Sequence, residues 1–256
     1  MIDVHAPDDP AAADHFDEHG WVLTRELTPD EVVTVQAWVD EVASWPLGGG
    51  DWLHHQELTD HGPQLCRSEN FIPFHTGLRS LLTERMAATA SLLLREPAVL
   101  YKEKINYKLA GGAGYSAHQD APAYPFVERH VSCMVAVDPA SIDNGCLEVV
   151  DRMHAELLPT DDRGCIPGDL ADGFTWMPVP LEAGMTLWFH SRTPHRRGPN
   201  RSDRDRRAMY PTYNAASHGD LRDAYYREKL ERFRTSAPGD RARVSLIGDF
   251  EGRPVV

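Results

Sequence analysis

The feature that most constrains the fold is a change of pattern near residue 97. Beyond it come short runs rich in β-branched and aromatic residues, separated by Gly, Pro, Asp and Asn, as in strands joined by turns. These runs predict strands at 99–108, 115–120, 130–137, 145–150, 184–190 and 206–213. A β-sandwich or barrel is the usual solution for many short strands.

Before residue 97 the chain carries helical signals instead. The segment Thr28-Pro29-Asp30-Glu31 has Thr at an N-cap, Pro at the first helical position and Glu at the third, which makes a capping box. Further helices are expected at 11–19, 77–95 and 220–233, whereas residues 51–76 show no sustained period. Helices followed by strands indicate an α+β chain with a mainly β core.

The charge balance excludes several kinds of partner. The chain has 26 basic and 39 acidic residues, a net charge of −13. Such a surface disfavours binding to nucleic acid and to anionic membranes, and no apolar run approaches the about 20 residues that span a bilayer. The first residues lack the pattern of a signal peptide, and the four Cys contain no CxxC pair, so the cytoplasm is the expected location.

A candidate metal site begins with His118 and Asp120 in the segment AHQDAP. On a strand, residues two apart point to the same face, so both side chains can reach one ion. Taken alone, this triplet more often marks a surface His beside an Asp. Non-haem Fe(II) oxygenases bind iron with two His and one carboxylate, and His195, just after an expected strand, fits the role of the second His.

Arg206 starts the last expected strand, eleven residues after His195. A cosubstrate with a distal carboxylate, such as 2-oxoglutarate, calls for a buried Arg because the planar guanidinium forms a bidentate pair. Arg204 and Arg207 are close competitors, and a solvated basic loop is the plain alternative. Strand alternation places Arg206 and Tyr210 on one face.

With these residues the chain resembles the phytanoyl-CoA dioxygenase family of Fe(II)- and 2-oxoglutarate-dependent oxygenases. The segments that carry the likeness are DEHGWVLTRELTPDEV, KEKINYKLAGGAGYSAHQDAPAY, NGCLEVVDRMH and GMTLWFHSRTPHRRGPNRSDRDRRAMYPTYN. The resemblance implies a double-stranded β-helix, a cupin-like jelly roll flanked by helices. We expect one domain over 1–256, with a largely helical flank at 1–97, the core and metal site at 98–216, and a helix and tail at 217–256.

The resemblance also implies the cofactors and their ligands. His118, Asp120 and His195 would bind Fe(II), Arg206 would hold the distal carboxylate of 2-oxoglutarate, and O2 would be the second cosubstrate. No side chain is assigned as acid or base. Arg197 departs from the family pattern, because many members have a small hydroxyl residue at this position that helps to hold the cosubstrate.

The expected strand KEKINYK places Lys102, Lys104 and Asn106 on one face. Lysines on a strand usually mark a solvated edge, but in the resemblance this strand lines the pocket. Lys104 and Asn106 are then candidates for cosubstrate contacts. The candidates for substrate contacts are Lys102, Tyr124, Trp188 and Arg197. Aromatic residues on strands, however, more often belong to the core.

The reaction that these implications predict is hydroxylation of an unactivated C–H bond in a small polar molecule, with 2-oxoglutarate and O2 converted to succinate and CO2. The phrases KEKINYK, HQDAPAY and RAMYPTYN resemble the subgroup that acts on small phosphonates, which makes the expected substrate anionic. A natural product or an amino acid is the alternative. From other classes, an inactive jelly-roll binding protein and a zinc hydrolase stay open. We expect a monomer or homodimer, and whether 151–183 close as a lid is open.

Overall fold

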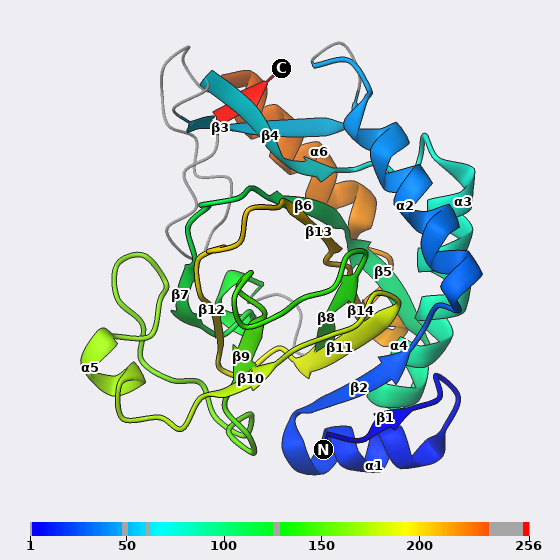
Figure 1. The fold of residues 1–256 in the computed structure, drawn as a ribbon. Coiled ribbons are helices and arrows are strands. Elements are labelled where there is room, and N and C mark those ends of the chain that lie inside the picture. Colours follow the sequence, from blue (N-terminus) through cyan, green and yellow to red (C-terminus); the bar gives the residue numbers. More distant parts are fainter. Residues whose placement is uncertain (1, 48–50, 60–61, 125–128, 236–252, 256) are drawn as a thin grey trace.

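The computed structural model describes residues 2–47, 51–59, 62–124, 129–235 and 253–255, and its strands form two sheets (Figure 1). The larger, 11-stranded sheet has the order β1 (Val4–His5), β2 (Trp21–Arg25), β11 (Met185–His190), β8 (His130–Ala136), β13 (Arg206–Met209), β6 (Lys104–Lys108), β4 (Gly62–Glu69), β3 (Leu53–Thr59) and β15 (Arg253–Val255). In the same sheet, β14 (Thr212–Ala215) pairs with β8 and with β5 (Ala98–Lys102). The smaller sheet has the order β10 (Met177–Val179), β9 (Leu147–Val149), β12 (His195–Arg197) and β7 (Tyr115–His118).

Helices cover the outer face of the larger sheet, opposite the smaller sheet (Figure 1). They are α1 (Pro10–His19), α2 (Pro29–Ala43), α3 (Thr76–Ser80) and α4 (Met86–Leu94), and a π-helical turn, η1 (Leu81–Arg85), joins the last two. Two further helices are α5 (Gly168–Ala171) and α6 (Arg222–Thr235). Within the described part of the chain, no helix is long and apolar enough to span a membrane.

Two hydrophobic clusters follow from the alternation of side chains along the strands. On β11, Trp188 points toward the helices and joins a cluster with residues of α1, α2 and α4. Its neighbours Leu187 and Phe189 point the other way, into the space between the sheets, where Met134 and Tyr210 lie. The interior between two antiparallel sheets is the inside of the predicted jelly roll, and the fold class is confirmed.

The strand predictions are confirmed with two breaks, and the strand expected at 115–120 ends at His118. The expected strand 99–108 divides at Glu103 into β5 and β6, and 206–213 divides at Tyr210-Pro211 into β13 and β14. The interpretation of 51–76 as irregular is wrong, because β3 and β4 pair with each other as an antiparallel hairpin, and β4 pairs with β6. The flank 1–97 is therefore not only helical. Part of the expected tail, 236–252, lies outside the described residues.

The capping box at Thr28 is formed as predicted, since the Thr28 Oγ accepts from the Glu31 amide and the Glu31 carboxylate accepts from the Thr28 amide at 2.8 Å. Thr28→Ala should lower the free energy of unfolding by about 1 kcal/mol, because the Glu31 amide at the helix start loses its hydrogen-bond acceptor. Urea denaturation measures this loss. Thr34→Ala, inside the same helix, is the control and should cause no loss, because Ala favours helix more than Thr does. Equal losses in both variants would contradict the assignment.

Candidate metal centre

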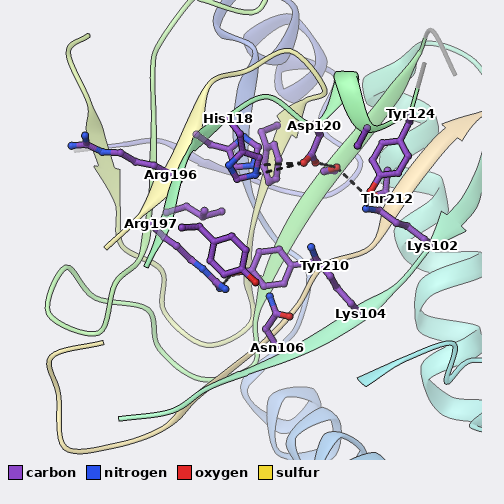
Figure 2. A pocket seen from close by; sticks show the side chains of 16 residues that line it. Lys102, Lys104, Asn106, His118, Asp120, Tyr124, Arg196, Arg197, Tyr210 and Thr212 are labelled. Carbon is purple, nitrogen blue, oxygen red and sulfur yellow. Dashed lines mark hydrogen bonds and ion pairs between the residues drawn. The ribbon is translucent and has the colours of Figure 1, made fainter. Parts of the chain in front are cut away.

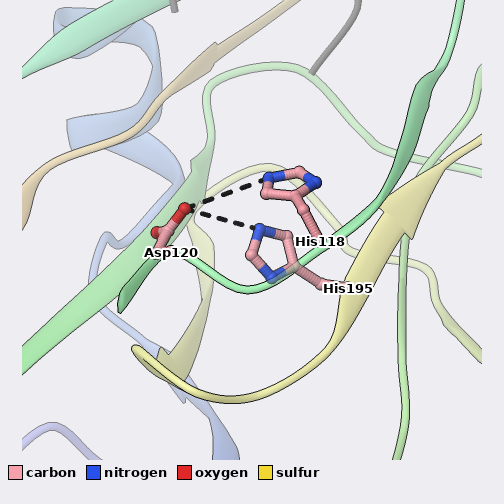
Figure 3. A group of neighbouring side chains, drawn as sticks. All are labelled: His118, Asp120 and His195. Atoms are coloured by element: carbon pink, nitrogen blue, oxygen red, sulfur yellow. Dashed lines mark ion pairs between the residues drawn. The ribbon is translucent and has the colours of Figure 1, made fainter. Parts of the chain in front are cut away.

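The two histidines of the predicted site meet because β7 and β12 are antiparallel neighbours. His118 lies directly opposite His195 in their register, and the ring centroids are 4.2 Å apart. Strand alternation predicted that Asp120 lies on the same strand as His118, but Asp120 lies beyond the end of that strand. It follows β7 in a helical conformation (φ −74°, ψ −29°) at the start of the 3-10 turn η2 (Ala121–Ala123). That turn brings its carboxylate to both rings, so one ligand atom from each residue lies within 4.8 Å of the others (Figure 3).

Backbone carbonyls orient both imidazoles. The Nδ1 of His118 lies 2.7 Å from the carbonyl oxygen of Ser116, and the Nδ1 of His195 lies 3.0 Å from that of Thr193. Each Nδ1 must therefore carry the proton and donate it, which leaves each Nε2 with a free lone pair. The two Nε2 atoms face Asp120 Oδ1 at 3.9 and 3.8 Å. Two nitrogen donors and one oxygen donor thus point into one space.

The electrostatic environment keeps all three groups in metal-binding form. Burial, together with the neighbouring His195, lowers the pKa of His118 to about 3, and burial also lowers the pKa of His195. Burial alone would raise the pKa of Asp120, but His195 and Lys102 outweigh it and hold that pKa below its ordinary value. At neutral pH the centre therefore offers two neutral imidazoles and one carboxylate, which suits Fe(II) or another divalent ion.

Ser132 on β8 completes the support of the carboxylate. Its Oγ donates to Asp120 Oδ2 at 2.5 Å and lies 3.1 Å from the Thr212 hydroxyl. This contact occupies one carboxylate oxygen and leaves Oδ1 toward the histidines. Outer contacts of this kind commonly fix the orientation of metal ligands.

A pocket opens beside these three residues (Figure 2). Most of the predicted site residues line it: Lys102, Lys104, Asn106, His118, Asp120, Tyr124, His195 and Arg197. Further lining residues that sequence reasoning did not single out as site residues are Tyr115, Ala123, Ser132, Leu147, Phe189, Arg196, Tyr210 and Thr212. The strand alternation of Tyr210 with Arg206 was the available signal for Tyr210.

Lysines form one wall of the pocket. Lys102 donates to the Tyr124 hydroxyl and lies 4.2 Å from the centre of that ring. Burial lowers the pKa of Lys102 to about 8, and burial, Arg67 and Lys102 hold the pKa of Lys104 well below its ordinary value. Neither lysine forms an ion pair with a carboxylate of the described residues. The two lysines share the pocket with a single lining carboxylate, Asp120, and this excess of cations favours an anionic occupant.

Arg206 lies behind this lining, not in it. It is 2% exposed, donates to the Tyr210 hydroxyl and reaches the carbonyl of Gly145 at 3.4 Å. Its Nε has no partner among the described residues. A buried guanidinium with an open donor next to the pocket fits the distal carboxylate of 2-oxoglutarate. Arg207, a competitor for that role, instead pairs with Asp138 at 2.7 Å near the surface helix α2.

Trp188 does not reach the pocket, so its interpretation as a substrate-wall residue is wrong. The side chain is fully buried under the helices, where its indole nitrogen donates to Thr24 Oγ1 at 2.9 Å. Because neighbours on a strand face opposite sides, Phe189 takes the pocket position instead. Its ring centroid is 4.6 Å from that of His195.

Arg67 on β4 is a residue that sequence reasoning missed. It is 2% exposed and donates to Asn106 Oδ1 at 3.0 Å and to the Tyr115 hydroxyl at 2.7 Å, so it supports two lining residues from behind. Arg67 also lies 3.6 Å from Glu69, whose carboxylate accepts from Lys229 of α6. The residues are distant in sequence, and only the β4–β6 pairing reveals their proximity.

Comparison with known proteins agrees with this geometry. The profile of the phytanoyl-CoA dioxygenase (PhyH) family matches residues 16–208. The methylphosphonate hydroxylase of Gimesia maris is 43% identical over 94% of this chain and 95% of its own length. The 2-aminoethylphosphonate dioxygenase of an uncultured bacterium is 40% identical over 78% of each chain.

Solved structures share the fold. EctD from S. alaskensis, crystallised with 2-oxoglutarate and 5-hydroxyectoine, aligns with a TM-score of 0.69 at 20% identity, over 83% of this chain and 78% of its own. The α-ketoglutarate-dependent epimerase SnoN from nogalamycin biosynthesis aligns with a TM-score of 0.66 at 24% identity, over 81% and 85%. From the family match and the two relatives, the chain belongs to the phytanoyl-CoA dioxygenase family and is a non-haem Fe(II)- and 2-oxoglutarate-dependent dioxygenase.

Proposed function

We propose that this dioxygenase hydroxylates a small phosphonate at the carbon next to phosphorus, with methylphosphonate as the first candidate. The observation that carries the proposal is the charge of the pocket. Its lining contains Lys102, Lys104, Arg197 and Arg196, the last of which pairs with Glu148, and among the described lining residues Asp120 is the one carboxylate. The two positive charges of Fe(II) balance the two negative charges of 2-oxoglutarate. The positive side chains of the pocket are then available to bind a second dianion. The names of the two phosphonate-hydroxylating relatives support the same class.

In this proposal the metal ligands are His118, Asp120 and His195. The metal and 2-oxoglutarate supply the chemistry: the cosubstrate and O2 become succinate and CO2 while one oxygen atom enters a C–H bond. The protein supplies position and a dry environment. The carbonyl contacts of the two imidazoles and the Ser132 contact of the carboxylate fix the three donor atoms before the metal binds.

The remaining lining residues divide between the two organic ligands. We assign Arg206, Lys104 and Asn106 to 2-oxoglutarate. We assign Lys102 and Tyr124, which Figure 2 shows beyond Asp120 and away from Arg197, to the phosphonate oxygens. An ammonium and a phenol hydroxyl together can donate to two oxygens of one phosphonate, which fixes its carbon toward the metal ligands.

The experiment that tests the function is a substrate panel. The enzyme with Fe(II), ascorbate and 2-oxoglutarate is incubated with methylphosphonate, 2-aminoethylphosphonate, or acetate and an amino acid as controls, and succinate is measured. We expect phosphonate-dependent succinate above the uncoupled background, together with the hydroxylated phosphonate by phosphorus NMR. Succinate that rises with an amino acid and not with either phosphonate would reject the proposal and favour amino-acid tailoring.

The pH dependence of substrate binding tests the role of Lys102. Its pKa is lowered by burial to about 8, so the ammonium form is lost as the pH rises through that value. The quantity to follow is the ratio of two KM values for methylphosphonate, that of the wild type over that of Lys102→Arg. We predict that this ratio rises by roughly tenfold from about pH 7 to about pH 9. The ratio removes the ionisation of the substrate itself, because both enzymes meet the same substrate and Arg stays charged. A ratio that is flat with pH would remove Lys102 from the substrate site.

The compartment is part of the proposal. The cysteines Cys66, Cys133, Cys146 and Cys165 are buried, and no disulfide joins any of them in the described structure, which suits the reducing conditions of the cytoplasm.

A further inference from the structure

Arg197 is a buried charge whose purpose the proposed function leaves open. It stands on β12 two residues after His195, so both side chains face the interior, and it is 8% exposed. Its guanidinium carbon lies 4.0 Å from the centre of the Tyr115 ring. Stacking of this kind fixes the guanidinium plane while its N–H groups stay available.

Tyr210 joins Arg197 to Arg206. The Tyr210 hydroxyl accepts from Arg197 Nη1 at 3.2 Å and also accepts from Arg206. Burial would raise the pKa of Tyr210, but the two arginines outweigh burial and hold that pKa below its ordinary value. Two guanidinium groups therefore share one phenol oxygen at the same end of the pocket.

This end of the pocket holds positive charge that no carboxylate of the described residues balances by an ion pair. Neither Arg197 nor Arg206 forms one, and the half-buried Glu57 is influenced by Arg197 only through its field. The neighbouring Lys108 donates to backbone carbonyls, and its pKa falls to about 6 through burial and the two arginines. Lys108 can lose its charge near neutral pH, but the arginines cannot. Two fixed charges in the interior favour an anion between them.

The position of this anion distinguishes the two organic ligands. Figure 2 shows Arg197 and Tyr210 below His118, whereas Lys102 and Tyr124 lie on the far side of Asp120. Arg206 lies behind Tyr210, where its unpartnered Nε is buried. An anion that meets both arginines is therefore remote from Lys102, the group assigned to the phosphonate.

We propose that Arg197 is a second binding residue for the distal carboxylate of 2-oxoglutarate, acting beside Arg206 and held by Tyr210 and Tyr115. This inference rests on the cosubstrate of the enzyme and not on the identity of the phosphonate. It moves Arg197 from the substrate-contact candidates to the cosubstrate site. The guanidinium provides charge and two donors at a position from which a small hydroxyl would provide one donor.

The test compares 2-oxoglutarate with 2-oxopentanoate, which keeps the chelating end and lacks the distal carboxylate. Calorimetry with the Fe(II)-loaded enzyme under anaerobic conditions gives Kd for both ligands without turnover. Arg197→Gln should weaken 2-oxoglutarate by about 10- to 100-fold, the range for a charge-assisted contact, and should change 2-oxopentanoate by less than about twofold. Arg206→Gln should give the same pattern.

The control is Arg204→Gln, in the segment between β12 and β13. The Arg204 side chain is 89% exposed and lies 3.9 Å from Asp203, so its loss should leave both Kd values unchanged. Steady-state kinetics add a second readout, since Arg197→Gln should raise the KM for 2-oxoglutarate far more than the KM for the phosphonate. The proposal is overturned if Arg197→Gln leaves the Kd of 2-oxoglutarate within twofold of wild type. It is also overturned if both oxoacids weaken equally, or if only the phosphonate KM rises.

Discussion

Asp120→Ala is expected to abolish substrate-dependent succinate formation, with a loss of at least about 100-fold in Fe(II) affinity. The physical reason is that Asp120 supplies the one carboxylate among the three converging donors, and the two neutral imidazoles alone leave the ion's charge uncompensated. The measurements are the Fe(II) stoichiometry of the purified protein and succinate release under saturating 2-oxoglutarate. Near-wild-type iron content in the variant would show that the ion binds elsewhere.

Two further variants are compared with Asp120→Ala, and we expect an intermediate loss in one and no loss in the other. Ser132→Ala removes the contact that holds Asp120 Oδ2, so we expect a smaller loss of roughly 10- to 100-fold, as for other residues behind metal ligands. Asp203→Ala removes an Asp whose side chain is 93% exposed, and it should behave like the wild type. If all three variants lose activity to the same extent, the effect is one of folding and not of ligation.

The second large effect concerns the stability of the charged network behind the pocket. Glu69 is 2% exposed and accepts from Lys229, and it lies 3.6 Å from Arg67 and 3.4 Å from His55. Glu69→Gln should lower the free energy of unfolding by about 3–5 kcal/mol, because buried cations then lose their counter-charge. Urea denaturation measures the loss. Glu182→Gln is the control, since its pair with Arg25 is exposed and should contribute less than about 1 kcal/mol.

The same network determines whether the free energy of unfolding rises or falls with pH. Burial would raise the pKa of Glu69, but Lys229, His55 and Arg67 hold it well below the ordinary 4.5. The carboxylate therefore stabilises the fold above pH 4.5, and this contribution is lost as the pH falls toward the lower, folded-state value. Glu69→Gln should flatten the acid limb of the stability curve. An acid limb that is unchanged in the variant would contradict the role of Glu69.

Sequence reasoning predicted the elements with strong local signals. The capping box at Thr28 and the β-branched runs after residue 97 specify structure through their nearest neighbours, and the metal ligands stand in a recognisable spacing. The β3–β4 hairpin was missed because its polar residues show no clean alternation, and its pairing with β6 is a long-range contact. Trp188 was misplaced because periodicity cannot tell which face of a strand is apolar core and which is pocket, when both are buried.

Other predictions stay predictions. The single domain, the monomer or homodimer, and closure of 151–183 as a lid are not tested by the fold. Residues 151–183 contain α5 and β10, so they are not without regular structure. The position of Asp120 could not be predicted from the sequence. The direction of its carboxylate depends on the turn after β7 and not on the strand itself.

The pairing of β4 with β6 has a consequence for protein engineering. Arg67 and Glu69 of β4 stand opposite Asn106 and Lys104 of β6, so one edge of the strand that bears these two pocket residues is completed by the N-terminal third of the chain. A trimmed catalytic fragment that starts near residue 98 would expose that edge as an open template for aggregation and would strip the support from Asn106. Shortened or chimeric versions of this enzyme must therefore keep the β3–β4 hairpin together with the jelly-roll core.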